Sequence, residues 1–468
     1  MTRLESDSIG TLAVDSEAYY GVQSLRAKMN FGITGQHMHQ ELIRSLAKLK
    51  KASAVTNMEA GKLMAYKAEA ISAAADEVIS GKFNSDFIVD AIQGGAGTSA
   101  NMNANEVIAN RAIEMLGGKK GDYSIIHPND DVNMAQSTND VYPSAGKLTA
   151  VMLIPATVHE LSLLEKSLLC KADEFDDVLK MGRTQLQDAV PMRLGQEFHA
   201  WASVIKRDIE RIKDAEKSMH ILNMAATAIG SAINVNDYYF DNIIRNINRV
   251  TGLTFTMADD LFDGTQNLDC FVNLSSALKT CAVDLSKICN DLRLLSSGPK
   301  TGIAEISLPA MQNGSSIMPG KVNPVIPEVV SQVAFNIIGN DLSVTMAAEA
   351  GQLELNAFEP VLFYNLFESI ETLGAAASTL TLNCVNGITA NRDICSRHLE
   401  ESVGITTALC PYIGYRISAE IAKESLKTGV SVRNIVLSRK LLSEHDLEKI
   451  LDPLSMTEHE SARNKETA

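Results

Sequence analysis

Several features that mark other classes of protein are scarce or missing in this chain of 468 residues. It has one tryptophan, 12 prolines and only 5% aromatic residues. Its seven cysteines are an odd number and form no Cys-x-x-Cys pair, which excludes a disulfide framework and a zinc site built on such pairs. We therefore expect free, mostly core cysteines in a reducing compartment.

The chain also has fewer basic residues than acidic ones. Lysine and arginine total 42 against 57 aspartates and glutamates, so the net charge is −15. That balance repels a nucleic-acid backbone, and we expect no nucleic-acid partner. The start of the chain carries Glu5 and Asp7 without an apolar segment, and we find no stretch of about 18 uncharged apolar residues. These absences predict a cytoplasmic protein that has no membrane partner.

What the chain does have is a strong helical pattern. Apolar residues recur at alternating spacings of three and four along several long segments, which is typical of helices with one buried face. The segments are 144–172, 194–219, 271–295, 327–350 and 362–384. Helices this long need partners along their whole length, so we expect a bundle that other subunits extend.

The pattern divides the chain into three predicted domains. Residues 1–141 form a mostly helical N-terminal domain with shorter helices at about 39–58 and 65–80. Residues 142–392 form the central bundle, and residues 393–468 form a small helical domain in which Ser443 and Asp446 resemble a capping box. Periodicity by itself leaves a different class of protein open, a helical scaffold without enzymatic activity.

Four polar stretches interrupt the helices. Each offers hydroxyl and amide groups, and Arg183 and Lys321 add one cation each. Such a set suits a small ligand rich in acceptor oxygens, for example a dicarboxylate. The stretches are residues 94–103, 136–140, 182–188 and 314–324.

Two of these stretches nearly match nucleotide-binding motifs. Gly95-x-Gly97-x-x-Ala100 fits the dinucleotide fingerprint, but the strand–turn–helix context of that motif is missing. The run from Gly314 to Lys321 has the wrong glycine spacing for a phosphate-binding loop. A nicotinamide enzyme is thus an alternative that a cofactor-binding measurement would test.

The fourth stretch is the most informative about chemistry. Gly314 and Gly320 flank Ser315 and Ser316, so the loop can move and close. Serine is a weak acid, but the cation of Lys321, backbone N–H donors and exclusion of water can lower the pKa of its hydroxyl. No Gly-x-Ser-x-Gly elbow is present, which argues against a hydrolase triad.

At this point the residues carry a family resemblance. The run Gly-Ser-Ser-Ile-Met-Pro-Gly-Lys-Val-Asn-Pro at 314–324 resembles the signature of the fumarase/aspartase superfamily. Further motifs of that superfamily lie at 95–99, 101–103, 136–140 and 181–188, so the resemblance spans nearly the entire chain.

Within the superfamily the sequence is more similar to the aspartase branch than to the fumarase branch. Gln185 stands where fumarases usually show His, and Gln352 with Leu353 is also aspartase-like. One departure is Asp131, which stands where relatives usually carry His. That segment is linked in the family to a secondary anion site, and whether such a site exists here is left open.

The resemblance implies the fold and the reaction. The fold is all-α and three-domain, with a long central bundle, in a homotetramer whose active sites each draw loops from three subunits. The reaction is the reversible deamination of L-aspartate to fumarate and ammonia through an enediolate intermediate. No cofactor or metal ligand is required, and activation by a divalent cation is left open. The alternatives are a class II fumarate hydratase or a related dicarboxylate lyase.

The resemblance also implies roles for individual residues. It assigns the general base, which takes the C3 proton, to Ser315. The other residues bind the substrate through hydroxyl, amide or ammonium groups. They are Thr98, Ser137, Thr138 and Ser316 for the β-carboxylate, Thr184, Lys321 and Asn323 for the α-carboxylate, and Asn139 and Gln185 for the amino group.

Overall fold

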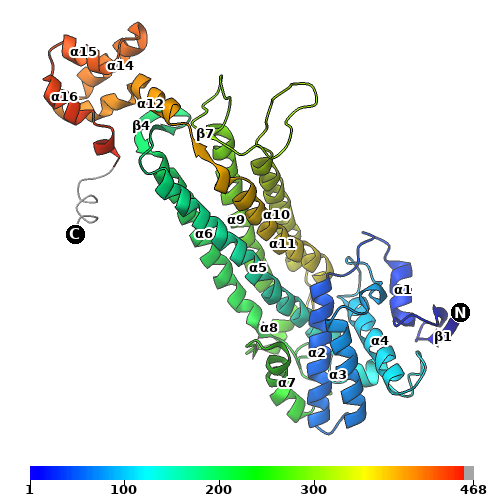
Figure 1. The fold of residues 1–468 in the computed structure, drawn as a ribbon. Helices are drawn as coiled ribbons and strands as arrows, with labels where there is room; N and C mark the ends of the chain where they lie inside the picture. Colours follow the sequence, from blue (N-terminus) through cyan, green and yellow to red (C-terminus); the bar gives the residue numbers. More distant parts are fainter. Residues whose placement is uncertain (458–468) are drawn as a thin grey trace. The chain divides into compact units, whose positions relative to one another are not determined.

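The computed structural model describes residues 1–457, and these are mostly helical (Figure 1). The helices before the bundle are α1 (Val22–Asn30), α2 (Gln40–Glu59), α3 (Ala65–Ile79) and α4 (Thr98–Met115). The five long helices are α5 (Thr138–Glu174), α6 (Leu194–Glu216), α9 (Asp269–Leu295), α10 (Val325–Glu349) and α11 (Glu359–Asn383). The others are α7 (Asp237–Thr251), α8 (Leu261–Gln266), α12 (Arg392–Glu401), α13 (Cys410–Ile413), α14 (Tyr415–Thr428), α15 (Val432–Ser438) and α16 (Glu444–Ile450).

The fold is mostly helical, as expected, and the described residues also contain short β-strands. Four two-stranded sheets occur among the described residues. The antiparallel pairs are β1 (Thr2–Ser6) with β2 (Thr11–Asp15), β3 (Leu179–Thr184) with β4 (Gln187–Arg193), and β7 (Ile306–Ser307) with β8 (Thr389–Ala390). The short pair β5 (Ile221–Leu222) and β6 (Thr256–Met257) is parallel. The sheets lie in the polar connections that the periodicity did not cover, because pairing is not encoded by a local repeat.

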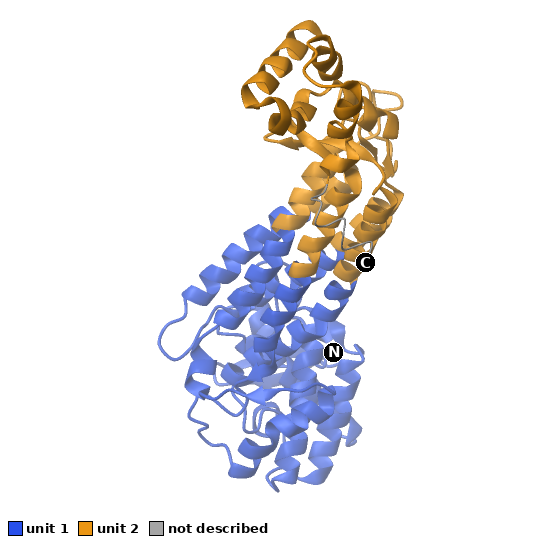
Figure 2. Ribbon diagram, turned by 90° about the vertical axis from the view of Figure 1, so that its left-hand side faces the viewer, with its two compact units in different colours: residues 1–159, 208–282, 333–375 blue, residues 160–207, 283–332, 376–468 orange. Residues whose placement is uncertain are grey.

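The chain forms two compact units (Figure 2). Unit 1 comprises residues 1–159, 208–282 and 333–375, and unit 2 comprises residues 160–207, 283–332 and 376–468. Each of the five long helices contributes one part to each unit. The three domains predicted from the sequence are a division of another kind and stay a prediction.

The predicted apolar faces are buried. In α9, Leu274 and Leu278 in unit 1 and Leu285, Ile288 and Leu292 in unit 2 are almost completely shielded from solvent. The same holds for the apolar stripes of α6 and α11. Burial of such side chains stabilises the fold by roughly 1.5–3 kcal/mol each. The helix positions were therefore predictable from spacing.

Helix α5 is a core helix with an unusual composition. Within residues 1–457 it is the one helix long and apolar enough to cross a membrane by length and composition. It nevertheless carries Lys147, which is buried and donates to the carbonyl oxygen of Ile221 at 2.7 Å, and Tyr142, which is buried against the ring of Phe363. These contacts are those of a helix inside a folded protein.

The C-terminal part of unit 2 has a small core of its own. Leu409, Ile421, Val436 and Leu447 are buried together there. The predicted helix start at Ser443 is confirmed, because its hydroxyl accepts from the Asp446 N–H at 3.1 Å where α16 begins.

Candidate active site

The first polar stretch forms the start of α4 in unit 1. Gly97 has φ +83° and precedes Thr98, the first residue of the helix. A side chain at Gly97 would clash with the ring of Tyr142. Glycine is therefore required at position 97 for two reasons: the backbone is left-handed, and the ring of Tyr142 leaves no space for a Cβ. It leaves Thr98 exposed at the helix end.

The second stretch forms the start of α5. The Ser137 N–H donates to Asp140 Oδ1 at 2.9 Å, and the Asn139 N–H donates to Ser137 Oγ at 3.2 Å. Asp140 is completely buried, and this burial raises the pKa of its carboxyl to about 7. The two hydrogen bonds hold Ser137, Thr138 and Asn139 in one tight turn.

A buried amide network joins these two stretches. Asn101 Nδ2 donates to Thr138 Oγ1 at 3.1 Å and to Asn133 Oδ1 at 3.2 Å. Lys50 Nζ also donates to Asn133 Oδ1, at 2.7 Å. Lys50 is fully buried, and burial lowers the pKa of its ammonium group to about 7. Unit 1 thus brings Thr138 into contact with the helix that Thr98 begins.

A fifth segment, which has no recognisable motif in the sequence, contacts the second stretch. Asn139 Nδ2 donates to the Ala228 carbonyl at 2.8 Å, and the Thr227 N–H donates to Asp140 Oδ2 at 3.0 Å. The loop 223–235 that carries these groups has positive φ at Ala225, Thr227, Ala232 and Asn234. The signal that could have revealed it is its run of small residues between helices, similar in character to the four polar stretches.

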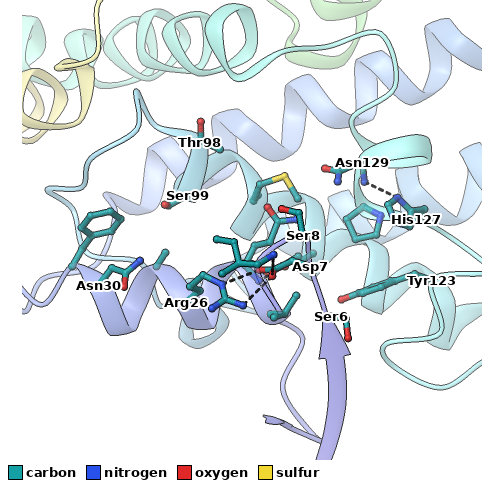
Figure 3. A pocket seen from close by; sticks show the side chains of 18 residues that line it. Ser6, Asp7, Ser8, Arg26, Asn30, Thr98, Ser99, Tyr123, His127 and Asn129 are labelled. Atoms are coloured by element: carbon teal, nitrogen blue, oxygen red, sulfur yellow. Dashed lines mark hydrogen bonds and ion pairs between the residues drawn. The ribbon is translucent and has the colours of Figure 1, made fainter. Parts of the chain in front are cut away.

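A cavity of about 510 Å³ lies in unit 1 beside the start of α4, and Figure 3 shows the side chains that line it. Thr98 is the predicted site residue that lines it, together with Ser99. Arg26 projects toward the cavity from α1 and forms two hydrogen bonds of 2.9 Å with Asp7. The positive charge of Arg26 is therefore balanced within the chain.

His127 and Asp131 lie in the segment that departs from the family pattern. His127 Nδ1 accepts from the N–H groups of Asn129 and Asp130 and caps the π-helical turn Pro128–Val132. The buried Asp131 pairs with Lys67 at 2.8 Å. Both side chains therefore have structural partners.

The third stretch forms the tip of the β3–β4 hairpin in unit 2. Thr184 pairs with Gln187, and the connecting residues Gln185 and Leu186 have φ of +54° and +62°. A two-residue turn with both residues left-handed matches the twist of a hairpin but costs side-chain-bearing residues energy. Thr184 and Gln185 are exposed at this tip.

A buried carboxylate anchors the hairpin. Glu305 is completely buried, and its oxygens lie 3.0 Å from Lys180 Nζ, 2.8 Å from an Arg183 nitrogen and 3.1 Å from His398 Nδ1. Burial would raise the pKa of Glu305, but these partners outweigh it and hold the pKa below its usual range. Arg183, which the sequence offered as a cation for a ligand, is instead engaged inside the protein.

The fourth stretch forms an exposed loop closed at its base. The Gly314 N–H donates to the Lys321 carbonyl at 2.9 Å, and Asn323 Nδ2 donates to the Gly314 carbonyl at 2.6 Å. Ser315 Oγ accepts from the N–H groups of Ile317 and Met318, at 3.2 and 3.0 Å. The hydroxyl oxygen of Ser315 therefore has two backbone donors.

The predicted residues are divided between the two units. Unit 1 contains Thr98, Ser137, Thr138 and Asn139, whereas unit 2 contains Thr184, Gln185, Ser315, Ser316, Lys321 and Asn323. Among residues 1–457, no group of three or more His, Cys, Asp or Glu side chains is arranged to hold a metal ion.

Comparison with known proteins identifies the class of protein to which this geometry belongs. A family model described as Lyase matches residues 10–339, and one described as Fumarase C C-terminus matches residues 405–458. The chain therefore belongs to this family of lyases. A crystal structure titled fumarate lyase:delta crystallin from Brucella melitensis bound to cobalt has a TM-score of 0.95 and 48% identity, over 98% of this chain and 100% of that one. That of a recombinant class II fumarase from Schistosoma mansoni has a TM-score of 0.95 and 33% identity, over 97% and 99%.

The curated relatives narrow the class. An aspartate ammonia-lyase of Helicobacter pylori (strain ATCC 700392 / 26695) is 52% identical over 97% of both chains. The aspartate ammonia-lyase of Bacillus subtilis (strain 168) is 49% identical over 97% of this chain and 96% of the relative. Within the lyases the chain belongs to the aspartate ammonia-lyases, which are carbon–nitrogen lyases.

Proposed function

We propose that the enzyme converts L-aspartate reversibly to fumarate and ammonia, with Ser315 as the general base that removes the C3 proton. The observation that supports this role is the pair of backbone N–H groups that donate to Ser315 Oγ. Donors aimed at an oxygen stabilise its negative charge, so they favour the deprotonated hydroxyl that a base must become. The relatives named above carry the activity in their names.

The chemistry requires stabilisation of a doubly charged intermediate. Removal of the C3 proton leaves an enediolate, which places two negative charges on the β-carboxylate. Hydroxyl donors preorganised around those oxygens would supply most of the catalysis. The proposal gives this task to Thr98, Ser137, Thr138 and Ser316, and it gives the α-carboxylate to Thr184, Lys321 and Asn323.

The amino group is assigned to Asn139 and Gln185. Because Asn139 Nδ2 donates to the Ala228 carbonyl, its Oδ1 is the atom left to face a ligand. An oxygen acceptor suits an ammonium group, which only donates, and does not suit a carboxylate. The orientation of this amide therefore suits the amino group of an amino-acid substrate better than a carboxylate.

We also propose that the sites are completed in a homotetramer. On α10, Phe335, Ile338, Leu342 and Met346 recur at helical spacing and are exposed in the single chain. A continuous apolar stripe of this kind typically marks a contact between subunits. Loops from three subunits would then join the residues that the two units carry separately.

Sharing of sites can be tested by mixing inactive variants. Thr138→Ala and Ser315→Ala lie in different units, so subunits of the two variants mixed by mild dissociation should rebuild some intact sites and recover activity. Each variant treated alone is the control. Absence of recovery in mixed oligomers, confirmed as mixed by mass spectrometry, would contradict shared sites.

The proposal further includes a cytoplasmic location, no nucleic-acid or membrane partner, and a reaction that needs no cofactor. Dialysis against a chelator before the assay tests the last point. Retained activity supports it, and activity restored only by a divalent cation would overturn it.

The test of function is the absorbance of fumarate formed from L-aspartate and, separately, from L-malate. We expect turnover of L-aspartate, and Ser315→Ala should lower kcat by about 10²–10⁴, the usual contribution of a general base. Ser396→Ala, which changes an exposed serine of the same unit, should leave kcat unchanged. Faster turnover of L-malate would favour fumarate hydratase, and a near-normal kcat of Ser315→Ala would remove Ser315 from the role.

A further inference from the structure

A second cavity of unit 1 lies apart from the predicted site residues. Its volume is about 190 Å³, and its walls come from residues 36–39 and Leu42, from Ala91 and Tyr142, and from the 360–371 part of α11. None of the predicted substrate-binding side chains lines it.

The base of this cavity is aromatic. The rings of Tyr142 and Phe363 have centroids 5.2 Å apart, and those of Phe363 and Phe367 are 5.4 Å apart and stacked. All three side chains are almost completely buried. Such a wall can take the flat or aliphatic body of a small ligand.

Apart from His37 and His39, the charged groups of the lining are acidic. Glu368 and Glu371 lie on α11 and are exposed, and the lining contains no lysine or arginine. His39 Nδ1 accepts from the Glu41 N–H at 3.2 Å, so its Nε2 carries the hydrogen that lies toward Glu371 at 3.1 Å. The two carboxylates therefore create a negative field over an aromatic base.

We propose that this cavity is a binding site for a small organic ammonium ion with an apolar body. The body would lie against Phe363 and Phe367, and the ammonium group would lie toward Glu368 and Glu371. Aromatic faces and carboxylates both attract cations, and a dicarboxylate would be repelled. The proposed ligand is thus a cation, whereas the substrate proposed for the lyase site is a dicarboxylate.

The cavity is linked to the substrate-binding segments through Tyr142. This ring lines the cavity and also packs against Gly97, the residue before Thr98. Tyr142 lies one helical turn after Thr138 in α5. An occupant that shifts the ring would therefore change the positions of both segments and, with them, the affinity for substrate. This coupling, unlike the binding itself, rests on the proposed function.

Binding is tested on the full-length protein with 2-phenylethylammonium, followed by ligand-observed NMR. Two probes of the same shape, neutral 2-phenylethanol and negatively charged phenylacetate, isolate the contribution of charge. We expect millimolar binding of the ammonium probe and weaker binding of the other two. Equal binding of phenylacetate, or no binding of the ammonium probe, would overturn the proposal.

A charge-removing variant locates the site. Glu368→Gln with Glu371→Gln should weaken binding of the ammonium probe about five- to tenfold, because two partly screened attractions are lost. Glu400→Gln with Glu401→Gln changes an exposed acidic pair in unit 2 and should leave binding unchanged. Equal binding by the wild type and the Glu368/Glu371 variant would place the probe elsewhere and refute this site.

Coupling is tested separately, by the KM for L-aspartate with and without saturating probe. A shift of KM that disappears in the Glu368/Glu371 variant supports the link through Tyr142, and an unchanged KM at saturation refutes it. Because the binding experiment needs no turnover, failure of the proposed function would leave the binding result intact.

Discussion

Arg183 donates to Glu305 across 2.8 Å, which fixes a strand next to the predicted substrate-binding tip of the β3–β4 hairpin. Glu305 is completely buried and is shared with Lys180 and His398. Arg183, the cation next to Thr184, therefore stabilises the fold of the hairpin.

Replacing this carboxylate should cost stability in a pH-dependent way. Glu305→Gln should lower the free energy of unfolding by about 3 kcal/mol at neutral pH, because the buried Lys180 and the partly buried Arg183 lose a counter-charge. The folded-state pKa of Glu305 lies below the ordinary value of 4.5, so the stabilisation is complete above that value and is lost as the pH falls through the folded-state pKa. Thermal unfolding should thus show that the difference in melting temperature between wild type and Glu305→Gln shrinks from neutral pH to about pH 3.5.

The matched control is Glu197→Gln, which removes the more exposed carboxylate that pairs with Lys180. Its effect should be smaller. If the stability difference between wild type and Glu305→Gln stayed constant down to acidic pH, the lowered pKa of Glu305 in the folded state would be contradicted.

The base of the serine loop should not tolerate a side chain at its first glycine. In Gly314→Ala the new Cβ would clash with the Lys321 carbonyl oxygen and lie 2.8 Å from the Asn323 nitrogen. The loop would have to open at its base, so we expect kcat to fall at least tenfold, with little change in melting temperature because the loop is exposed. Steady-state kinetics measure kcat, and thermal unfolding measures the melting temperature.

Gly320→Ala is the control: its φ of +78° costs about 1 kcal/mol, but nothing lies within 4 Å of the new Cβ. Equal kcat values in the two variants would show that the closed base is unimportant.

The strained hairpin tip should be easy to stabilise. Leu186 has φ +62° and is 69% exposed, so Leu186→Gly relieves a left-handed conformation at little loss of packing. We expect the free energy of unfolding to rise by up to about 1 kcal/mol, measured as a higher melting temperature. Gln185→Gly relieves similar strain but removes the amide proposed to meet the amino group, so it should stabilise the fold while impairing turnover. Destabilisation by Leu186→Gly would show that its side chain has a partner.

Lys321 is predicted to act mainly in substrate binding. Lys321→Ala should raise the KM for L-aspartate by about ten- to a hundredfold, the loss expected for one charge-assisted hydrogen bond. Lys300→Ala changes another exposed lysine of unit 2 and should leave KM unchanged. Unchanged KM and kcat in Lys321→Ala would count against its assignment.

Some parts of the structure were predictable because their signal is local. The stripes from Leu274 to Leu292 and from Leu362 to Leu380 are buried as their spacing indicates. The loop 223–235 was missed because its role depends on contacts with Asn139 and Asp140, far away in the chain. Arg183 was misjudged for the same reason, since its partner Glu305 lies 122 residues further on.

The order of residues alone determined the long helices and the family signature, because helical periodicity and a contiguous motif need no knowledge of distant neighbours. Folding in three dimensions decided which polar groups remain free for a ligand. Arg183 is neutralised by Glu305, whereas Asn139 has its amide turned by Ala228 so that an oxygen is left to accept. Hydrogen bonds and ion pairs between segments far apart in the sequence decide this, because each occupies a donor or acceptor that appears free in the sequence alone.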